Sequence, residues 1–375
     1  MIRIQRRQTA PRWLLIAVPV VSLVAAFAAA AVVLLVAGKD PVVTYQRLFD
    51  RAFFGPGALT STLVTATPLL LTGLAAAAAF RMRLWNIGGE GQLYLGAVGA
   101  SGAGIALHSQ PGPVLIAGMI LAGALAGAIW AVVPGILKAY FNTNEIITTL
   151  MLNYVAGLLL LYLIFDSHSY WRDLSTFSAR QFPQGKVLVD AAAWPTFDLG
   201  IAIAPFGFVL GIVAALALWL LYRSTVFGFQ VRVLGDSASA ARYAGIKTRR
   251  VLVAMMALSG ALAGLGGASE VGDFRHVLDP RGLQQAGLGY AGIVVAALAR
   301  YNPFAVAIVA VLIGGLANAG YSLQGPDFPA GLVGVLQGMI LFFALGGELL
   351  LRYRVTFGSP RAAGPREAAV GASRP

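Results

Sequence analysis

The chain has 375 residues, of which 58% are hydrophobic and only 11% are charged. Soluble domains carry about 25% charged residues, so this surface cannot all face water. The net charge of +12 does not indicate nucleic-acid binding, because the basic residues lie in short gaps between apolar runs. The chain has no cysteine, which excludes disulfides, and its three scattered histidines argue against a metal site. The composition predicts an integral, all-α membrane protein.

Apolar runs of about 20 residues, the length that crosses a bilayer, recur along the whole chain. The first run, from Trp13 to Ala37, is longer than the apolar region of a cleaved signal peptide, so an uncleaved helix is expected. The eighth is short and should end before Pro303, because proline cannot continue a helix. The predicted helices are ten: 13–37, 60–80, 87–107, 113–137, 145–165, 201–222, 251–270, 286–300, 303–322 and 329–351.

The basic residues fall mainly on one side of these ten helices. With a cytoplasmic N-terminus, 19 of the 27 lysines and arginines lie in cytoplasmic segments and 8 in external ones, as the positive-inside rule requires. Both termini are then cytoplasmic. Residues 1–355 are expected to form one transmembrane domain, with an external loop at 166–200 and a cytoplasmic segment at 223–250. The small and polar residues of 356–375 predict a disordered cytoplasmic tail.

Glycines are abundant and several are spaced by four residues, which lets membrane helices approach closely. These pairs are Gly123 with Gly127, Gly260 with Gly264, and Gly334 with Gly338. No phosphate-binding loop, zinc-protease motif or nucleophile elbow is present. The chain is therefore not expected to be an enzyme or to hydrolyse ATP itself.

Glu90 lies in the run Gly88-Gly89-Glu90-Gly91, at the start of the third predicted helix and between Asn86 and Gln92. Glycine is about 1 kcal/mol worse than alanine in a helix. An interrupted helix is one interpretation, and its free backbone groups could hold a substrate. The other is a regular helix with Glu90 in its first turn near the headgroups, stabilised by the helix dipole.

A second set of polar residues repeats every four positions in the fifth predicted helix: Glu145, Thr149 and Asn153. They share one helix face, which either lines a pathway or bonds to a neighbouring helix, and we favour the second. Glu270 and Asn318 are isolated in apolar runs and are interpreted as structural.

In the cytoplasmic segment, Asp236 is predicted to cap a short alanine-rich helix over 237–244, and Gly245 to end it. So short a helix is not stable alone in water. A helix held at the membrane surface suits docking of a cytosolic partner, and a simple connector is the alternative.

Four motifs together resemble the permease subunits of bacterial ATP-binding-cassette (ABC) importers, in the branch of simple-sugar, branched-chain amino acid and nucleoside permeases. The likeness extends over about residues 60–350, and the first motif is most similar to the nucleoside and simple-sugar members. Gly89 departs from that motif, where relatives often carry a side chain. The motifs are Asn86-Ile87-Gly88-Gly89-Glu90-Gly91-Gln92; Asn144-Glu145-Ile146-Ile147 with Met151-Leu152-Asn153-Tyr154; Thr225, Gly228, Arg232, Gly235, Ala240-Ala241 and Gly245-Ile246; and Gly289-Tyr290, Ala296-Ala297-Leu298 and Asn302-Pro303.

The resemblance implies a type II-like ABC importer permease, a multi-pass protein of the bacterial cytoplasmic (inner) membrane. It would translocate a nucleoside or simple sugar delivered by an extracytoplasmic substrate-binding protein. The implied partners are a second permease subunit, identical or different, and a cytosolic ATP-binding subunit, within the lipid membrane and without nucleic acid. No cofactor is expected on this chain, because ATP and Mg²⁺ would bind the ATPase.

The resemblance also implies two groups of functional residues. A substrate pathway would involve Asn86, Glu90, Gln92, Glu145, Thr149 and Asn153. Coupling to the ATPase would involve Arg232, Gly235, Asp236, Ala240, Ala241, Gly245 and Ile246. The alternatives are a branched-chain amino acid ABC permease, a stand-alone secondary transporter that uses Glu90 and Glu145 for proton coupling, and a membrane-bound enzyme or passive channel.

Overall fold

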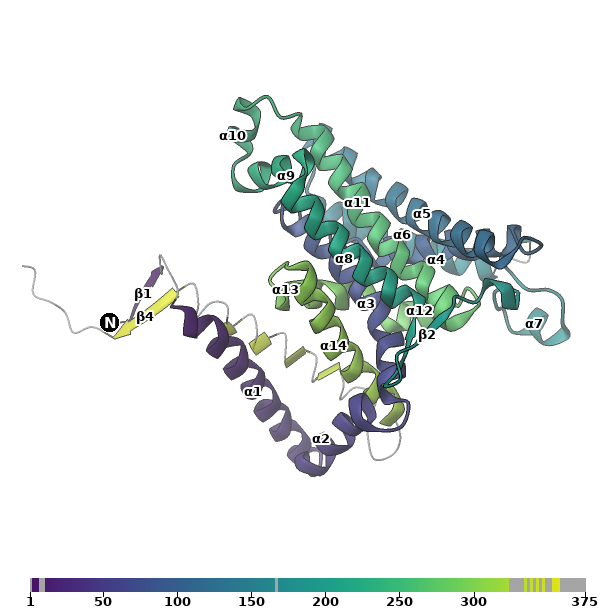
Figure 1. Ribbon diagram of the computed structural model, residues 1–375, viewed down its shortest axis with the longest axis horizontal. Helices are drawn as coiled ribbons and strands as arrows, with labels where there is room; N and C mark the ends of the chain where they lie inside the picture. Colours follow the sequence, from purple (N-terminus) through teal and green to yellow (C-terminus); the bar gives the residue numbers. More distant parts are fainter. Residues whose placement is uncertain are drawn as a thin grey trace, which may run out of the picture. The chain divides into compact units, whose positions relative to one another are not determined.

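The computed structural model describes residues 2–6, 11–165, 168–323, 334–335, 338–339, 342–343, 346–347 and 353–357. The chain forms two compact units: Met1–Pro41 with Gly334–Pro375, and Val42–Val333. In the first unit, α1 (Arg12–Val36) is an apolar helix of 25 residues. Strands β1 (Ile2–Arg6) and β4 (Tyr353–Phe357) pair antiparallel, with Ile2 opposite Phe357 (Figure 1). This unit joins the two ends of the chain.

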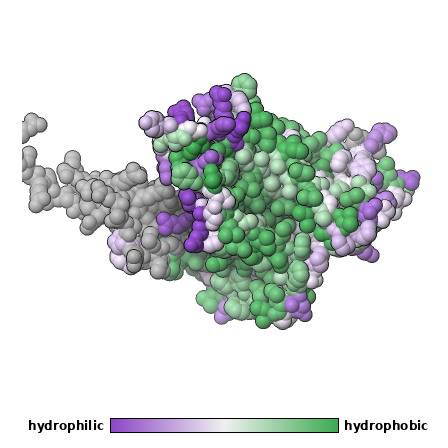
Figure 2. Space-filling view, turned by 45° about the horizontal axis from the view of Figure 1, so that its top comes forward, coloured by the Kyte–Doolittle hydropathy of each residue, from purple (hydrophilic) through white to green (hydrophobic). Residues whose placement is uncertain are grey.

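The second unit is a bundle of helices (Figure 1). Its long helices are α3 (Ala58–Phe80), α4 (Gly89–Ala106), α5 (Gly112–Phe141), α6 (Glu145–Phe165), α8 (Phe206–Ser224), α11 (Thr248–Ser269) and α14 (Pro303–Leu323). Its shorter helices are α2 (Pro41–Phe49), α7 (Phe177–Gln181), α9 (Val226–Asp236), α10 (Ala238–Tyr243), α12 (Pro280–Ala286) and α13 (Leu288–Leu298), with π-helical turns η1 (Asp50–Phe54) and η3 (Glu270–Arg275) and a 3-10 turn η2 (Asp190–Ala192). Hydrophobic residues cover most of the visible face in Figure 2.

Six helices of the described residues are long and apolar enough to cross a membrane: α3, α5, α6, α8, α11 continued by η3 to Arg275, and α14. This confirms the helical membrane fold. Nine of the ten predicted segments coincide with a helix, and the tenth, 329–351, falls mainly outside the described residues. Helix α13 rises only about 16 Å over its 11 residues, roughly half of a 30 Å hydrocarbon core. The number of ten spans stays a prediction.

Helix α3 lies at the centre of the bundle. Every residue from 66 to 80 is buried, and the helix packs against α8, α11, α13 and α14. Threonines inside α3 satisfy their hydroxyls within the protein, as when Thr72 Oγ1 donates to Pro68 O at 2.7 Å. A wholly buried apolar helix of this kind acts as the shared core for the helices around it.

Glycines bring α5 and α11 together, as the four-residue spacing predicted. A Cβ built on Gly127 would collide with the Gly260 carbonyl oxygen, and one on Gly264 with the carbonyl oxygen of Gly123. Helix α4 joins the same contact, because a Cβ on Gly96 would meet the backbone of Gly264. The three backbones therefore touch directly, with no side chain between them.

The fold is mostly helical, as the all-α prediction requires, and two short antiparallel sheets accompany the helices. One is β1 with β4, and the other is β2 (Thr196–Asp198) with β3 (Ile203–Pro205). The second sheet explains why α8 begins at Phe206 rather than at the predicted residue 201. Of the predicted disordered tail, residues 358–375 lie outside the described part of the chain.

Candidate functional site

The loop between α3 and α4 is fixed by a reciprocal pair of amides. Asn86 Nδ2 donates to Gln92 Oε1, and Gln92 Nε2 donates back to Asn86 Oδ1, both at 3.0 Å. Asn86 Nδ2 also donates to Ser259 Oγ of α11 at 2.9 Å. All three side chains are buried. These bonds tie the loop to α4 and α11, and they leave no side-chain amide of this pair free for a ligand.

Glu90 is 1% exposed and caps a different helix. Its Oε2 accepts hydrogen bonds from the backbone N–H groups of Gly289 at 2.6 Å and Tyr290 at 3.2 Å. Its Oε1 accepts one from the Tyr94 hydroxyl at 2.8 Å. The first N–H groups of a helix have no partner within it, and a carboxylate there also meets the positive end of the dipole. Glu90 thus joins the start of α4 to the start of α13.

Of the two interpretations of Gly88–Gly91, the interrupted helix is wrong and the regular helix is right. Helix α4 is regular from Gly89 onward, and Glu90 occupies its first turn, where it is buried. The broken helix is its partner: α12 ends at Ala286, Gly287 adopts the left-handed conformation at φ +57°, and α13 begins at Leu288. The glycine-rich run instead allows close packing, because a Cβ on Gly289 would collide with the Glu90 backbone.

The polar face of α6 is turned toward the same loop and helix start. Asn153 Oδ1 accepts from Gly91 N at 2.9 Å, and its Nδ2 donates to Ile87 O at 2.9 Å and to the Tyr290 hydroxyl at 3.2 Å. Thr149 Oγ1 accepts from Ile87 N at 3.3 Å. Glu145 pairs with Lys138 of α5 at 2.9 Å. The side chains of Asn153 and Thr149 thus bond α6 to the start of α4.

The six predicted pathway residues are therefore close together, and their hydrogen bonds and ion pair form a network that joins α4 with α5, α6, α11 and α13. Four members of this network were not predicted as site residues: Ser259, Tyr94, Tyr290 and Lys138. Tyr290 belongs to a motif that carried the family resemblance, and that was its signal in the sequence. Tyr94 is one turn after Glu90, whereas Ser259 has no sequence signal because it lies 173 residues from Asn86.

The predicted cap of the cytoplasmic segment was wrong by one residue. Asp236 is the last residue of α9, and Ser237 caps α10 by accepting from Ala240 N at 3.2 Å. Helix α9 itself was not predicted, and Thr225 caps it by accepting from Gly228 N at 3.0 Å. Ser237 therefore lies between two short helices and caps the second of them. Gly245 follows α10 with φ +72°, as expected.

The predicted coupling residues differ in how exposed they are. Gly235 and Ala241 are buried, and a Cβ on Gly235 would approach the Arg81 carbonyl oxygen. Asp236, Ala240 and Gly245 are exposed, Ile246 is half-buried, and Arg232, though exposed, donates to Tyr222 O at 2.8 Å. Tyr243, which was not predicted, is 98% exposed at the end of α10. It presents the most accessible aromatic ring of α9 and α10.

Two more carboxylates lie beyond α11, in η3: Glu270 is buried and Asp273 is half-buried. Glu270 accepts from Arg275 Nε at 2.8 Å, and Arg275 also pairs with Asp279 at 2.7 Å. Asp273 accepts from the N–H of Gly207, in the first turn of α8, at 3.0 Å. Like Glu90, Asp273 therefore caps a helix to which it does not belong, and the interpretation of Glu270 as structural fits its ion pair.

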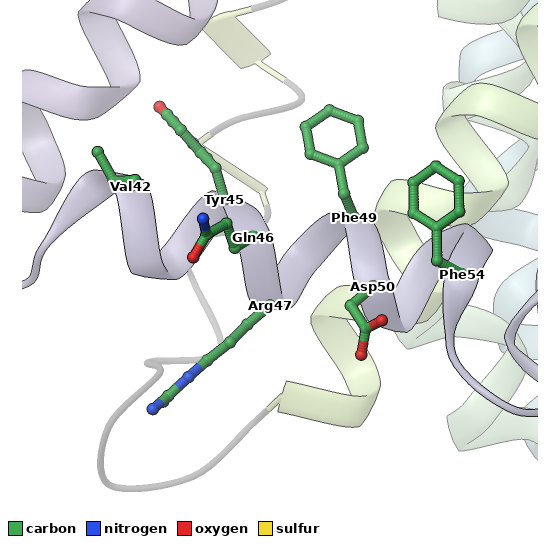
Figure 3. Close-up of a pocket in the computed structure, with 7 residues that line it drawn as sticks. All are labelled: Val42, Tyr45, Gln46, Arg47, Phe49, Asp50 and Phe54. Atoms are coloured by element: carbon green, nitrogen blue, oxygen red, sulfur yellow. The ribbon is translucent and has the colours of Figure 1, made fainter.

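Among the described residues, two surface hollows contain no predicted site residue. One, of about 760 Å³, lies along α2 and η1 and is shown in Figure 3. Its lining residues Val42, Tyr45 and Phe49 have further interactions within the protein, so we assign it no ligand. The other, of about 730 Å³, lies in the predicted external loop near Arg172 and Lys186. The candidate site is thus taken to be the helix-joining network around Glu90.

These features together define a class of protein. Long apolar helices surround a broken helix whose half-buried break is flanked by bonds to polar groups of α4 and α6, an arrangement typical of multi-pass membrane transport proteins. The chain belongs to the family described as branched-chain amino acid transport system / permease component, which it matches over residues 58–345. The resemblance noted in the sequence is thereby confirmed, and the protein is a multi-pass permease subunit of the bacterial inner membrane.

Relatives match the chain over nearly its whole length. The glucose ABC transporter permease protein TsgB13 of Haloferax volcanii is 34% identical over 94% of this chain and 93% of its own. The guanosine ABC transporter permease protein NupP of Bacillus subtilis is 31% identical over 87% and 92%. The nucleoside ABC transporter permease protein NupB of Lactococcus lactis is 30% identical over 87% and 89%.

Proposed function

We propose that this chain is the permease subunit of an ATP-driven importer that carries a simple sugar or a nucleoside. The observation that carries the proposal is the similarity, over at least 87% of the chain, to three permeases named for glucose, guanosine and nucleosides. The family description alone names branched-chain amino acids. We give the relatives more weight because each is named for a sugar or a nucleoside and matches nearly the whole chain, whereas the description of the family is broader.

The importer would contain this chain and a second permease subunit, a cytosolic ATP-binding subunit that holds ATP and Mg²⁺, and an extracytoplasmic substrate-binding protein. The chain itself would carry no cofactor and catalyse no reaction. We propose a type II-like arrangement of ten spans with both termini in the cytoplasm, residues 1–355 as the permease domain and 356–375 as a tail. The segment 166–200 would then face the binding protein, and 223–250 the ATPase.

The six network residues would act by positioning helices along the pathway. Asn86, Gln92 and Glu90 are at most 2% exposed, and the side chain of each is hydrogen-bonded to other groups of the protein. Their bonds hold the start of α13 and the loop before α4 in fixed register. This supports a role in shaping or gating the path, in which a change of hydrogen-bond partner accompanies movement of α13.

The substrate class is tested with the companion binding protein. We expect the purified binding protein to retain radiolabelled nucleosides or simple sugars, and the assembled transporter to accumulate the same compound in proteoliposomes only when ATP is present. Retention of branched-chain amino acids alone would contradict the proposed substrate. Accumulation that is abolished by a proton uncoupler at constant internal ATP would contradict ATP-driven transport.

Coupling is tested at Tyr243, because substitution of the buried Gly235 or Ala241 would disturb the fold as well as the contact. Replacement of Tyr243 by glutamate places a charge at the centre of the exposed α10 surface and removes an aromatic side chain. Such buried aromatic anchors typically contribute about 2 kcal/mol or more to an interface. We expect at least about a tenfold loss of ATPase co-purification and of ATP-dependent uptake.

The matched control is Phe177→Glu, which charges a ring that is 75% exposed in the predicted external loop. It should leave ATPase co-purification unchanged. Equal retention of the ATPase by Tyr243→Glu and by the wild type would show that α10 is not the docking surface.

A further inference from the structure

The surface that the broken helix leaves open is polar. Within Pro280–Leu298, all of which is described, the exposed residues are Arg281, Gln285 and Tyr290. No aliphatic residue of this stretch is fully exposed, although Ile293, Val294 and Leu298 are half-buried. The contrast is with α5, whose exposed large residues include Leu121, Leu125, Ile129, Val133 and Ile136. Helix α5 therefore presents a surface suited to lipid, whereas the most exposed side chains of α12 and α13 are polar.

A surface of this kind does not face lipid, because the bilayer core offers no hydrogen-bonding partner to an amide. Gln285 makes no side-chain hydrogen bond to the described residues. Its neighbour Gln284, by contrast, donates to Gly157 O of α6 at 2.9 Å. Arg281 lies 5.7 Å from the ring centre of Phe165, at the end of α6. The exposed polar groups thus follow the seam between α12, α13 and α6 and face water or another protein.

Tyr290 is held in place on this surface although it is 42% exposed. Its backbone N–H donates to Glu90, and its hydroxyl accepts from Asn153. The next residue of α6, Tyr154, is 65% exposed. Two tyrosines therefore stand beside the break at Gly287, one of them fixed by the buried network. Fixing an aromatic ring before binding lowers the entropy cost of a contact.

We propose that Gln285, Tyr290 and Tyr154, with Arg281 at the α12 end, form this chain's contact surface for the transported molecule, and that the molecule is a neutral ring compound bearing hydroxyl groups. The proposal rests on the proposed function. The tyrosine rings offer flat apolar faces to a sugar or nucleobase, and their hydroxyls offer a polar edge. The Gln285 amide both donates and accepts, as a hydroxyl-rich substrate requires.

The surface is one half of a site. Binding sites commonly bury 70–90% of a small ligand, whereas these side chains are open on one side in the single chain. The second permease subunit supplies the opposite wall, and the transported molecule passes between the two. The network around Glu90 then lies directly behind the contact surface and sets the position of Tyr290.

The absence of cysteine from the chain makes thiol labelling a direct test in the assembled transporter in native membranes. Single variants Gln285→Cys and Tyr154→Cys are treated with a charged, water-soluble methanethiosulfonate reagent. The controls are Leu125→Cys on α5 and Leu158→Cys on α6, where the leucines are 60% and 67% exposed. We expect the two test positions to react at least about tenfold faster than the controls, since the reagent needs an ionised thiol in water. Substrate presented on its binding protein should slow the labelling by at least about fivefold.

Three results would overturn the proposal. Labelling at position 285 as slow as at 125 would show that the face is covered by lipid or protein. Fast labelling without substrate protection would show a watery surface that the substrate does not touch. Loss of the second permease subunit on co-purification of Gln285→Leu would place the face in the subunit interface, whereas we expect retention and a roughly tenfold higher half-saturation for uptake. Failure of the wild-type transporter to take up any sugar or nucleoside would instead refute the proposed function.

Discussion

Replacement of Glu90 by alanine is expected to destabilise the protein and to impair transport strongly. The substitution leaves the N–H groups of Gly289 and Tyr290 and the hydroxyl of Tyr94 without their acceptor. A buried donor without a partner costs about 1–3 kcal/mol. We expect a loss of about 2–5 kcal/mol in the free energy of unfolding. This is less than the sum for three donors, because some of them find water or a neighbouring acceptor once the structure relaxes. Uptake should fall at least about tenfold, since α13 loses its fixed position.

Thermal unfolding in detergent and uptake into proteoliposomes measure the two effects. Glu90→Gln keeps one acceptor oxygen for α13 but loses the charge, so its effects should lie between those of the wild type and alanine. Tyr94→Phe removes one of the three bonds and should cost about 1 kcal/mol. Wild-type unfolding temperature and uptake in Glu90→Ala would show that the link between α4 and α13 is dispensable.

Replacement of Gly264 by valine is expected to have the largest effect on folding. A Cβ there collides with the Gly123 carbonyl oxygen and approaches Gly127 Cα at 3.0 Å. Backbone cannot move aside as a flexible side chain can, so α5 and α11 must separate along their length. We expect a loss of at least about 3 kcal/mol and little monodisperse protein after extraction. Size-exclusion chromatography of detergent-solubilised protein measures this fraction.

The matched control is Gly89→Ala, at a glycine that has room. Its Cβ would lie 3.8 Å from the nearest atom, the Gly289 carbonyl oxygen, which is an ordinary contact. Because alanine is a better helix former than glycine by up to about 1 kcal/mol, the variant should be as stable as the wild type or more so. The presence of glycine here is therefore compatible with relatives that carry a side chain. Normal folding of Gly264→Val would refute the close helix crossing.

Hydropathy located the helices well because apolar length is a local property. Trp13–Ala37 and the turn before Pro303 were readable from a few consecutive residues. The helix α13 was harder, because it has only 11 residues and one side of it packs against α3, and composition alone does not reveal that packing. The cap at Ser237 was missed since Asp236 is an equally good capping residue, and the choice depends on α9 continuing through Asp236.

The candidate site could be predicted only as a set of residues. The spacing of Glu145, Thr149 and Asn153 indicated one helix face, and that face does bond to a neighbour. The partner of Glu90 could not be predicted, because it consists of backbone N–H groups 199 and 200 residues away. Backbone donors leave no mark in a sequence. The break at Gly287 was missed for the same reason, because it is marked by backbone N–H groups at the start of α13 that bond to Glu90 of α4.

The glycine crossing of α4, α5 and α11 has a consequence for movement during a transport cycle. Helices that touch backbone to backbone have no side-chain layer that could slide or change rotamer, so these three should travel as a single rigid body. Helix α13 touches the α4 backbone at its start, where Gly289 lies against Glu90, and α6 reaches the start of α4 through the side chains of Asn153 and Thr149. Alternation between inward and outward openings is therefore expected to occur as a rotation of α6, α12 and α13 about these contacts, against the block of α4, α5 and α11.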